Sequence, residues 1–153
     1  MEKPKLIISA CLFGYPVRFN GGAKPLPAAQ LQKLGKHYDL IPVCPECQGG
    51  LPVPRAAAEI TGGSGADVLS GKARVLTSSG EDATEEFIAG AKVVLNEALT
   101  LQVKYALLKS NSPSCAAHQH YDGSFGGKLR EGQGVTAALL QQNGIRVINE
   151  DDF

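Results

Sequence analysis

The sequence predicts a single α/β domain built on a mostly parallel sheet with helices on both faces. The length of 153 residues suits one domain, because single domains usually contain roughly 100 to 200 residues. Hydrophobic residues make up 43% of the chain and charged residues 20%, which places it among globular proteins and not among disordered ones. Short apolar runs also alternate with segments of helical spacing, and this alternation favours a parallel sheet. We therefore treat residues 1–153 as one domain.

The N-terminal part of the chain predicts two strands that each end at a cysteine. Residues 5–10 form a short apolar run that enters a segment rich in glycine and proline, so we expect a buried strand followed by a loop. Cys11 is the first residue after that strand. Apolar residues then recur at helical spacing over about 27–38, and residues 40–43 form a second apolar run with Cys44 at its end.

The middle of the chain is expected to be mostly irregular, with one clear helix after it. Glycine and proline dominate residues 45–54, more glycines mark a loop at 62–65, and one short strand is predicted near Val75. A helix is predicted over 82–100, where Asp or Thr can cap its start. One face of that helix is apolar and consists of Phe87, Ala91, Val94, Leu95 and Ala98.

The C-terminal third repeats the pattern of a strand followed by a cysteine-containing loop. Residues 105–108 read as a third core strand, and the polar loop 110–115 that follows ends in Cys115. A helix is predicted over about 135–142, because an Asn-Gly pair after it favours a left-handed cap. The last strand is predicted over 145–148.

Three cysteines therefore occupy equivalent places in the predicted fold. In a Rossmann-like parallel sheet, ligands bind outside the carboxyl ends of the strands. Cys11, Cys44 and Cys115 each follow a predicted strand, so we expect them to converge on one site at that edge of the sheet.

Thiolates that converge in this way select zinc or an iron–sulfur cluster. A 4Fe-4S cluster on three cysteines leaves one iron free to bind a substrate atom, whereas structural zinc prefers four closed ligands. Cys47 keeps a second hypothesis open, because Cys44 and Cys47 form a CxxC pair that could complete a four-cysteine zinc module. A thiol redox protein is a third hypothesis, although the glycines after the pair are not expected to open a good helix.

Charge and hydropathy limit the partners. Fifteen basic residues balance fifteen acidic ones, so no net positive field attracts a nucleic acid polymer, and a small substrate is expected. No apolar run approaches the roughly 20 residues of a spanning helix, so we expect no membrane insertion. Residues 8–11 resemble a lipoprotein cleavage box, but the stretch before them is too short for a signal peptide. We expect a cytoplasmic protein, in which thiols stay reduced.

Several motifs in the same order resemble the thiouracil desulfurase family, and the resemblance covers nearly the whole chain. The motifs that carry it are Ser-Ala-Cys-Leu at 9–12 with Gly14 and Val17-Arg18, Pro-Val-Cys-Pro-Glu at 42–46, Gly-Gly-Leu-Pro-Val-Pro-Arg at 49–55, Leu-Lys at 108–109, Ser-Pro-Ser-Cys at 112–115, Tyr-Asp-Gly-Ser-Phe at 121–125 and Gly-Gln-Gly-Val-Thr-Ala at 132–137.

The resemblance implies an oxygen-sensitive 4Fe-4S cluster bound by Cys11, Cys44 and Cys115. It also implies that the free iron captures the sulfur of a thiolated nucleobase such as 2-thiouracil, so that non-redox catalysis gives uracil and sulfide. The family places the acid and base chemistry on Glu46 and Ser112. Water must attack the carbon of the C=S group, so a carboxylate or hydroxyl is needed to accept its proton.

Other residues near these motifs are weaker candidates for the site. Arg18 and Arg55 are candidates for substrate contacts, and each could instead pair with a carboxylate. Cys47 is not carried over as a ligand, because the motif needs only the cysteine before Pro-Glu. We expect His118 and His120 to be solvent-exposed residues of a polar loop.

Overall fold

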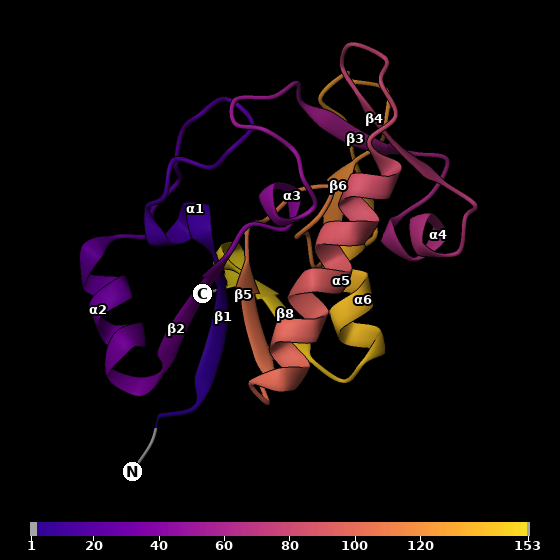
Figure 1. Cartoon of the computed structure of the whole chain (residues 1–153). Coiled ribbons are helices and arrows are strands. Elements are labelled where there is room, and N and C mark those ends of the chain that lie inside the picture. Colours follow the sequence, from indigo (N-terminus) through magenta and orange to yellow (C-terminus); the bar gives the residue numbers. More distant parts are fainter. Residues whose placement is uncertain (1–2, 153) are drawn as a thin grey trace.

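The protein is built around a parallel sheet of four strands, as predicted (Figure 1). The computed structural model describes residues 3–152. In spatial order the strands are β2 (Asp39–Val43), β1 (Lys5–Ser9), β5 (Tyr105–Leu108) and β8 (Arg146–Asn149), and each pairs in parallel with its neighbour. Within residues 3–152 no helix is long and apolar enough to cross a membrane.

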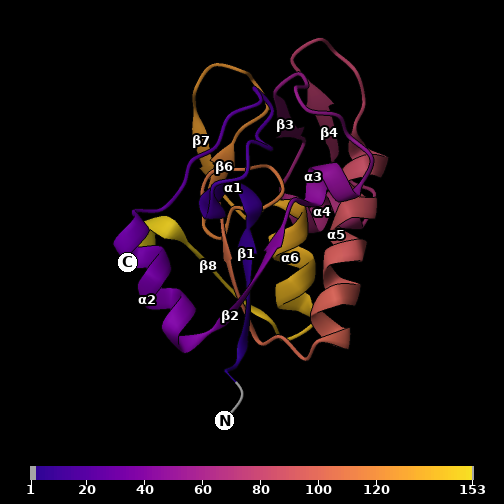
Figure 2. The same cartoon turned by 60° about the vertical axis from the view of Figure 1, so that its left-hand side comes forward.

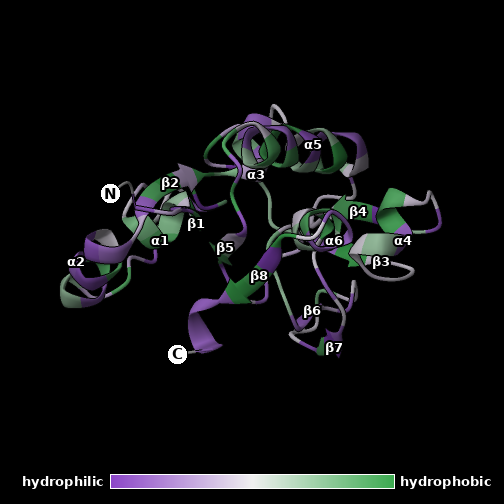
Figure 3. Cartoon of the chain, turned by 90° about the horizontal axis from the view of Figure 1, so that it is seen from below, coloured by the Kyte–Doolittle hydropathy of each residue, from purple (hydrophilic) through white to green (hydrophobic). Residues whose placement is uncertain are grey.

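Helices cover both faces of this sheet, which confirms the predicted fold class (Figure 2). Alternate side chains of a strand point to opposite faces. Thus Ile7 packs with α5 (Thr84–Thr100) and α6 (Val135–Gln142), whereas Leu6 and Ile8 pack with α1 (Ala10–Phe13) and α2 (Ala28–His37). The central strands are mostly apolar, whereas α2 carries many hydrophilic residues (Figure 3). The helix lies at the surface, and none of its residues is buried.

The middle of the chain is more regular than its sequence indicated. It contains β3 (Ala58–Thr61), α4 (Gly65–Leu69) and β4 (Arg74–Thr77), and β3 and β4 form an antiparallel pair beyond the carboxyl end of the main sheet (Figure 1). A second pair, formed by β6 (Gln119–Tyr121) and β7 (Leu129–Glu131), lies nearby. All four strands are too short to show a hydrophobic period. The pair of β3 and β4 is stabilised by a core of Ile60, Val68, Val75, Phe87 and Val135.

Two cysteines lie in one-turn helices where loops were expected. Cys11 lies in α1, directly after β1, and Cys47 lies in α3 (Pro45–Gln48), directly after β2 and Cys44. Proline is favoured at the first position of a helix, so Pro45 supports the start of α3. The two glycines that follow then end it after one turn, and Gly50 has a φ of 100°.

His120 is buried, which contradicts the expectation that it is exposed. Its Nδ1 donates to the carbonyl of Tyr121 at 2.7 Å, and the hydroxyl of Ser64 donates to its Nε2 at 2.8 Å. Burial lowers the pKa of His120, so the ring is neutral at pH 7. The expectation holds for His118, which is exposed and whose Nε2 lies 2.9 Å from Asp152 Oδ1.

Helix α3 lies against α5 through a contact between glycines. A Cβ atom at Gly90 would overlap the carbonyl of Pro45, and a Cβ atom at Gly49 would overlap the carbonyl of Glu86. The two backbones can therefore approach closely only because both positions lack a side chain. This contact fixes the segment that carries Cys44 and Glu46.

We predict that Gly90→Ala destabilises the protein, although alanine favours helix by up to about 1 kcal/mol over glycine. The added methyl must push α3 away from α5, and overpacking of this kind typically costs about 1–3 kcal/mol. Gly35→Ala in α2 is the matched control, because its Cβ would meet no atom within 4 Å. Urea unfolding should show a lower midpoint for Gly90→Ala and an unchanged or higher midpoint for Gly35→Ala. Equal stability of the two variants would contradict the close contact.

Candidate functional site

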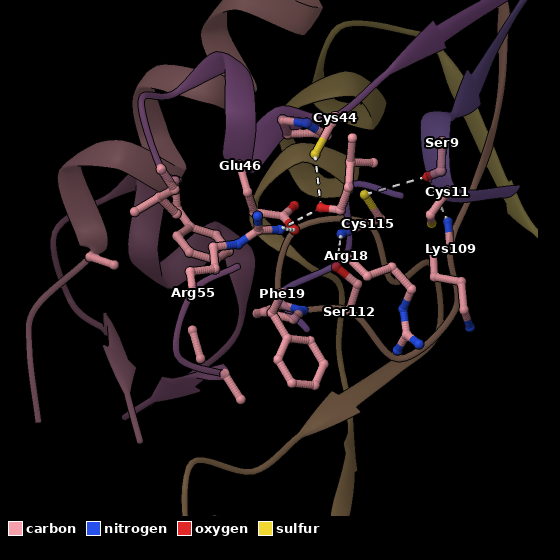
Figure 4. A pocket seen from close by; sticks show the side chains of 18 of the residues that line it. Ser9, Cys11, Arg18, Phe19, Cys44, Glu46, Arg55, Lys109, Ser112 and Cys115 are labelled. Carbon is pink, nitrogen blue, oxygen red and sulfur yellow. Dashed lines mark hydrogen bonds and ion pairs between the residues drawn. The ribbon is translucent and has the colours of Figure 1, made fainter. Parts of the chain in front are cut away.

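A cavity of about 620 Å³ opens at the carboxyl ends of β1, β2 and β5, between the main sheet and the two small antiparallel pairs. Figure 4 shows that side chains from distant parts of the chain face this space. The residues predicted to form the site all line it: Cys11, Arg18, Cys44, Glu46, Arg55, Ser112 and Cys115.

The three cysteines reach the cavity from three neighbouring strands. Cys11 follows β1, Cys44 follows β2, and Cys115 lies in the loop after β5. Because β1 pairs with both β2 and β5, the ends of these strands are adjacent. Cys47 is not among the residues that line the cavity, and Arg55 Nη1 lies 4.0 Å from its Sγ.

The surroundings of the thiols keep them protonated while they hold no metal. Burial raises the pKa of Cys44 to about 12, and the carboxylate of Glu46 contributes in the same direction. Burial and Glu46 also raise the pKa of Cys115 and of Cys11. These thiols are therefore poor free nucleophiles, and they become thiolates when a metal replaces their protons.

The backbone around Cys115 is held by hydrogen bonds to the side chain of Asn149. Asn149 Nδ2 donates to the carbonyl of Cys115 at 3.1 Å and to that of Leu108 at 2.7 Å, while its Oδ1 accepts from the N–H of Ala117 at 2.8 Å. Asn149 is the last residue of β8 and is buried. Like the cysteines, Asn149 lies at the carboxyl end of a core strand, where parallel sheets bind ligands. The sequence could therefore have identified it as a residue near the site.

Ser112 supports the same loop. Its Oγ accepts the N–H groups of Ser114 and Cys115, each at 3.1 Å, so the hydroxyl proton remains free to donate toward the cavity. Ser112 thus has the turn role that serine often has before proline, and it also presents a hydroxyl to the cavity.

Substitutions can separate the two roles of Ser112. We predict that Ser112→Ala lowers turnover by about a hundredfold or more and also destabilises the fold by about 1–3 kcal/mol, because two buried N–H groups lose their acceptor. Ser112→Asn keeps an acceptor oxygen for the turn and should recover stability but not turnover. Thermal unfolding and initial rates measure the two effects. Full activity in either variant would leave Ser112 with the turn role alone.

Glu46 and Arg55 form a pair at the wall of the cavity. Their side chains are 18% and 8% exposed, and Arg55 Nη2 lies 2.9 Å from Glu46 Oε2. Arg55 also donates to the carbonyls of Val17 at 3.2 Å and Pro52 at 3.0 Å. Arg55 therefore pairs with a carboxylate, the second of the two roles expected for it, and a contact of Arg55 with substrate stays a prediction.

Arg18 presents its guanidinium to the cavity. It makes no ion pair within residues 3–152, and its guanidinium carbon lies 5.7 Å from the ring centroid of Phe19. Both side chains line the cavity (Figure 4). An arginine and an aromatic ring together can contact a flat, polar heterocycle.

Lys109 and Glu150 form a further ion pair that sequence reasoning missed. Lys109 Nζ lies 2.6 Å from Glu150 Oε2, and the N–H of Ser110 donates to Glu150 Oε1 at 2.7 Å. Although burial alone raises the pKa of Glu150, the bonds from Lys109 and Ser110 lower it overall. Through Ser110, the pair stabilises the start of the loop that leads to Cys115.

We predict that Glu150→Gln lowers the free energy of unfolding at pH 7 by about 1–3 kcal/mol. The folded-state pKa of Glu150 lies below its ordinary value of 4.5, so the stabilisation is present above pH 4.5 and is lost as the pH falls through the folded value. The difference between wild type and variant should therefore shrink below pH 4.5. Urea unfolding at pH 7 and in acid measures it, and Asp151→Asn, at an exposed neighbour, should change neither. A constant difference at all pH values would exclude the charge as its cause.

The donor set fits an iron–sulfur cluster better than a single ion. Four thiolates around zinc lie about 3.8 Å apart, since each Zn–S bond is about 2.3 Å. Among residues 3–152, no group of three His, Cys, Asp or Glu side chains is arranged to hold one metal ion. Three soft sulfurs spread around one cavity suit a larger cluster, whose ligands bind at separate corners.

Known proteins resemble this chain over nearly its full length. A model of the 2-thiouracil desulfurase family matches residues 6–152. The uncharacterized protein YbbK of Bacillus subtilis (strain 168) is 44% identical over 148 residues, which are 97% of each chain. The solved structure of the 4Fe-4S-dependent thiouracil desulfidase TudS is 42% identical, with a TM-score of 0.87 over 99% of this chain and 93% of that one. The chain therefore belongs to the 2-thiouracil desulfurase family.

Proposed function

We propose that this protein is an enzyme that removes sulfur from a small thiolated nucleobase such as 2-thiouracil. The reaction replaces C=S by C=O and releases sulfide, at a 4Fe-4S cluster held by Cys11, Cys44 and Cys115. One observation carries this proposal: three thiols from adjacent strand ends, two buried and one half-buried, face a single cavity that also presents a carboxylate and a hydroxyl. We also propose that the protein is cytoplasmic, because thiols stay reduced in that compartment.

The four-cysteine zinc module is less well supported. It requires Cys47 to join the other three thiols, but Cys47 lies outside the lining of the cavity. Its Sγ instead faces the guanidinium of Arg55. The membership of the desulfurase family also favours the cluster.

A bound cluster with three thiolate ligands supplies one iron that can act as a Lewis acid for a soft thiocarbonyl sulfur. The side chains of this chain supply the rest. Glu46 is placed to accept a proton from the water that attacks the carbon, and Arg55 holds its carboxylate in place. The Ser112 hydroxyl is placed to donate a hydrogen bond to the reacting groups. The overall balance is one water consumed and one hydrogen sulfide released, with no change of oxidation state.

Glu46 does not help the three thiols to bind a metal, and this supports a role for it in the chemistry. Its negative charge raises the pKa of all three thiols and so opposes their ionisation. A carboxylate in that place is useful where a proton must be removed from water.

Arg18 and Phe19 both line the cavity, which supports a place for the substrate beside them. We propose that the ring of the base lies against Phe19 and that Arg18 donates to its carbonyl oxygen. The balanced overall charge of the chain supports a small substrate over a nucleic acid polymer.

Anaerobic purification tests the proposal directly. The protein should be brown, contain about four irons and four sulfides per chain, and convert 2-thiouracil to uracil with one sulfide released per turnover. Chromatography of the base and colorimetric assay of sulfide measure the products. A colourless protein that contains zinc and leaves 2-thiouracil unchanged would support the zinc module instead.

A further inference from the structure

Ser9 lies next to Cys115 in the fold, although the two are 106 positions apart in the sequence. Ser9 is the last residue of β1 and is 3% exposed, and its Oγ lies 3.7 Å from Cys115 Sγ. Figure 4 shows the serine pointing from the end of its strand toward this sulfur. Its side chain therefore faces Cys115 and not the solvent.

The direction of this hydrogen bond is fixed by a second one. The backbone N–H of Lys109, the first residue after β5, donates to Ser9 Oγ at 2.9 Å. A hydroxyl has one proton and two lone pairs, so a Ser9 oxygen that accepts from Lys109 keeps its proton for another partner. Within residues 3–152 that partner is Cys115 Sγ.

Cys115 differs in this respect from the other two proposed ligands. Within residues 3–152, neither Cys11 nor Cys44 accepts a hydrogen bond from a side-chain hydroxyl, and Cys44 Sγ faces the carbonyl of Val17 at 3.9 Å. Cys115 is also 4% exposed, so water has little access to its sulfur. A thiolate there needs a donor from the protein, because an unpaired buried charge is costly.

We propose that Ser9 is a positioning residue for the metal centre, which donates a hydrogen bond to the Cys115 thiolate and thereby tunes the cluster that this sulfur holds. The inference rests on the ligand role proposed for Cys115. Hydrogen bonds to ligand sulfurs withdraw negative charge from an iron–sulfur cluster, which raises its reduction potential and slows loss of iron.

The test compares three substitutions at one position. Ser9→Ala and Ser9→Val remove the hydroxyl, while Ser9→Thr keeps it, and valine and threonine have nearly the same shape. After anaerobic reconstitution, Ala and Val should have a more negative midpoint potential than wild type and release iron to a chelator several times faster. Thr should resemble wild type on both measurements.

Ser114→Ala is the matched control for disturbance of the loop. Ser114 is buried beside Cys115, but its hydroxyl pairs with Thr136 Oγ1 at 2.7 Å and not with the sulfur. Its midpoint potential should equal that of wild type. An equal shift in Ser114→Ala, or a Thr variant that behaves like Val, would mean that packing and not the hydroxyl sets the potential, and the proposal would be overturned.

A measurement on the wild type keeps the test independent of how the variants fold. Pulsed electron paramagnetic resonance of the reduced cluster should detect one strongly coupled proton that exchanges in D₂O. Absence of that proton would overturn the role of Ser9. If Cys115→Ser itself retains a full cluster, the ligand assignment fails; if that variant loses the cluster while Ser9→Ala keeps the wild-type potential, only the inference about Ser9 fails.

Discussion

Cys115→Ser is expected to abolish cluster binding and to reduce desulfuration below detection, and Cys11→Ser and Cys44→Ser should do the same. Each thiol is the single cysteine after its strand that lines the cavity. A serine hydroxyl neither ionises at neutral pH nor matches the preference of iron–sulfur clusters. Iron and acid-labile sulfide per chain, measured after anaerobic reconstitution, give the result.

Cys47→Ser is the control, because it removes the fourth cysteine of the chain without removing a sulfur from the cavity lining. It should keep four irons and the wild-type rate. Retention of iron and sulfide in the Cys115 variant would exclude the three-ligand assignment. Loss of metal in the Cys47 variant would instead favour the four-cysteine site.

The positions of the cysteines could be predicted because they depend on topology and little else. Short apolar runs end just before Cys11 and Cys44, and parallel strands that are neighbours place such residues together. The loop that carries Cys115 is longer, yet the end of β5 was enough to place it. The central sheet was predicted for the same reason, since each strand is apolar and bounded by turn residues.

The two antiparallel pairs, β3 with β4 and β6 with β7, could not be predicted in the same way. Their strands contain three or four residues each, so an alternation of apolar and polar side chains cannot be distinguished from chance. Tertiary contacts stabilise β3 and β4: Ile60 and Val75 are buried against residues of α4, α5 and α6. His120 was misjudged for a related reason, since its partner Ser64 is 56 residues away.

The polar supports of the site depend on long-range contacts that no local pattern reveals. Arg55 was equally consistent with a substrate contact and with an ion pair, and only the fold shows that Glu46 lies 2.9 Å from its guanidinium. The pairing of Lys109 with Glu150 links residues 41 positions apart. Ser9 was noted only as part of a motif, although its place at a strand end is of the same kind as that of the cysteines.

Glu46→Gln is expected to lower kcat by about a hundredfold to ten-thousandfold, the usual contribution of a general acid or base. The amide has the shape of the carboxylate and can still accept a hydrogen bond from Arg55, but it cannot take a proton from water at neutral pH. Cluster content should not fall, because removal of this negative charge eases ionisation of the three thiols. Initial rates and iron content of the same samples measure both effects.

Two further variants separate the chemistry of Glu46 from general effects of charge. Glu81→Gln removes another carboxylate from the cavity lining and should keep the wild-type rate, because no ligand cysteine lies near it in sequence and its backbone belongs to the turn after β4. Glu46→Asp keeps the charge but withdraws it by one methylene, so it should retain more activity than Glu46→Gln and less than wild type. A Glu46→Gln enzyme that turns over at the wild-type rate would assign activation of water to another group. Equal losses in Glu46→Gln and Glu81→Gln would show that the cavity needs negative charge as such and not a base at residue 46.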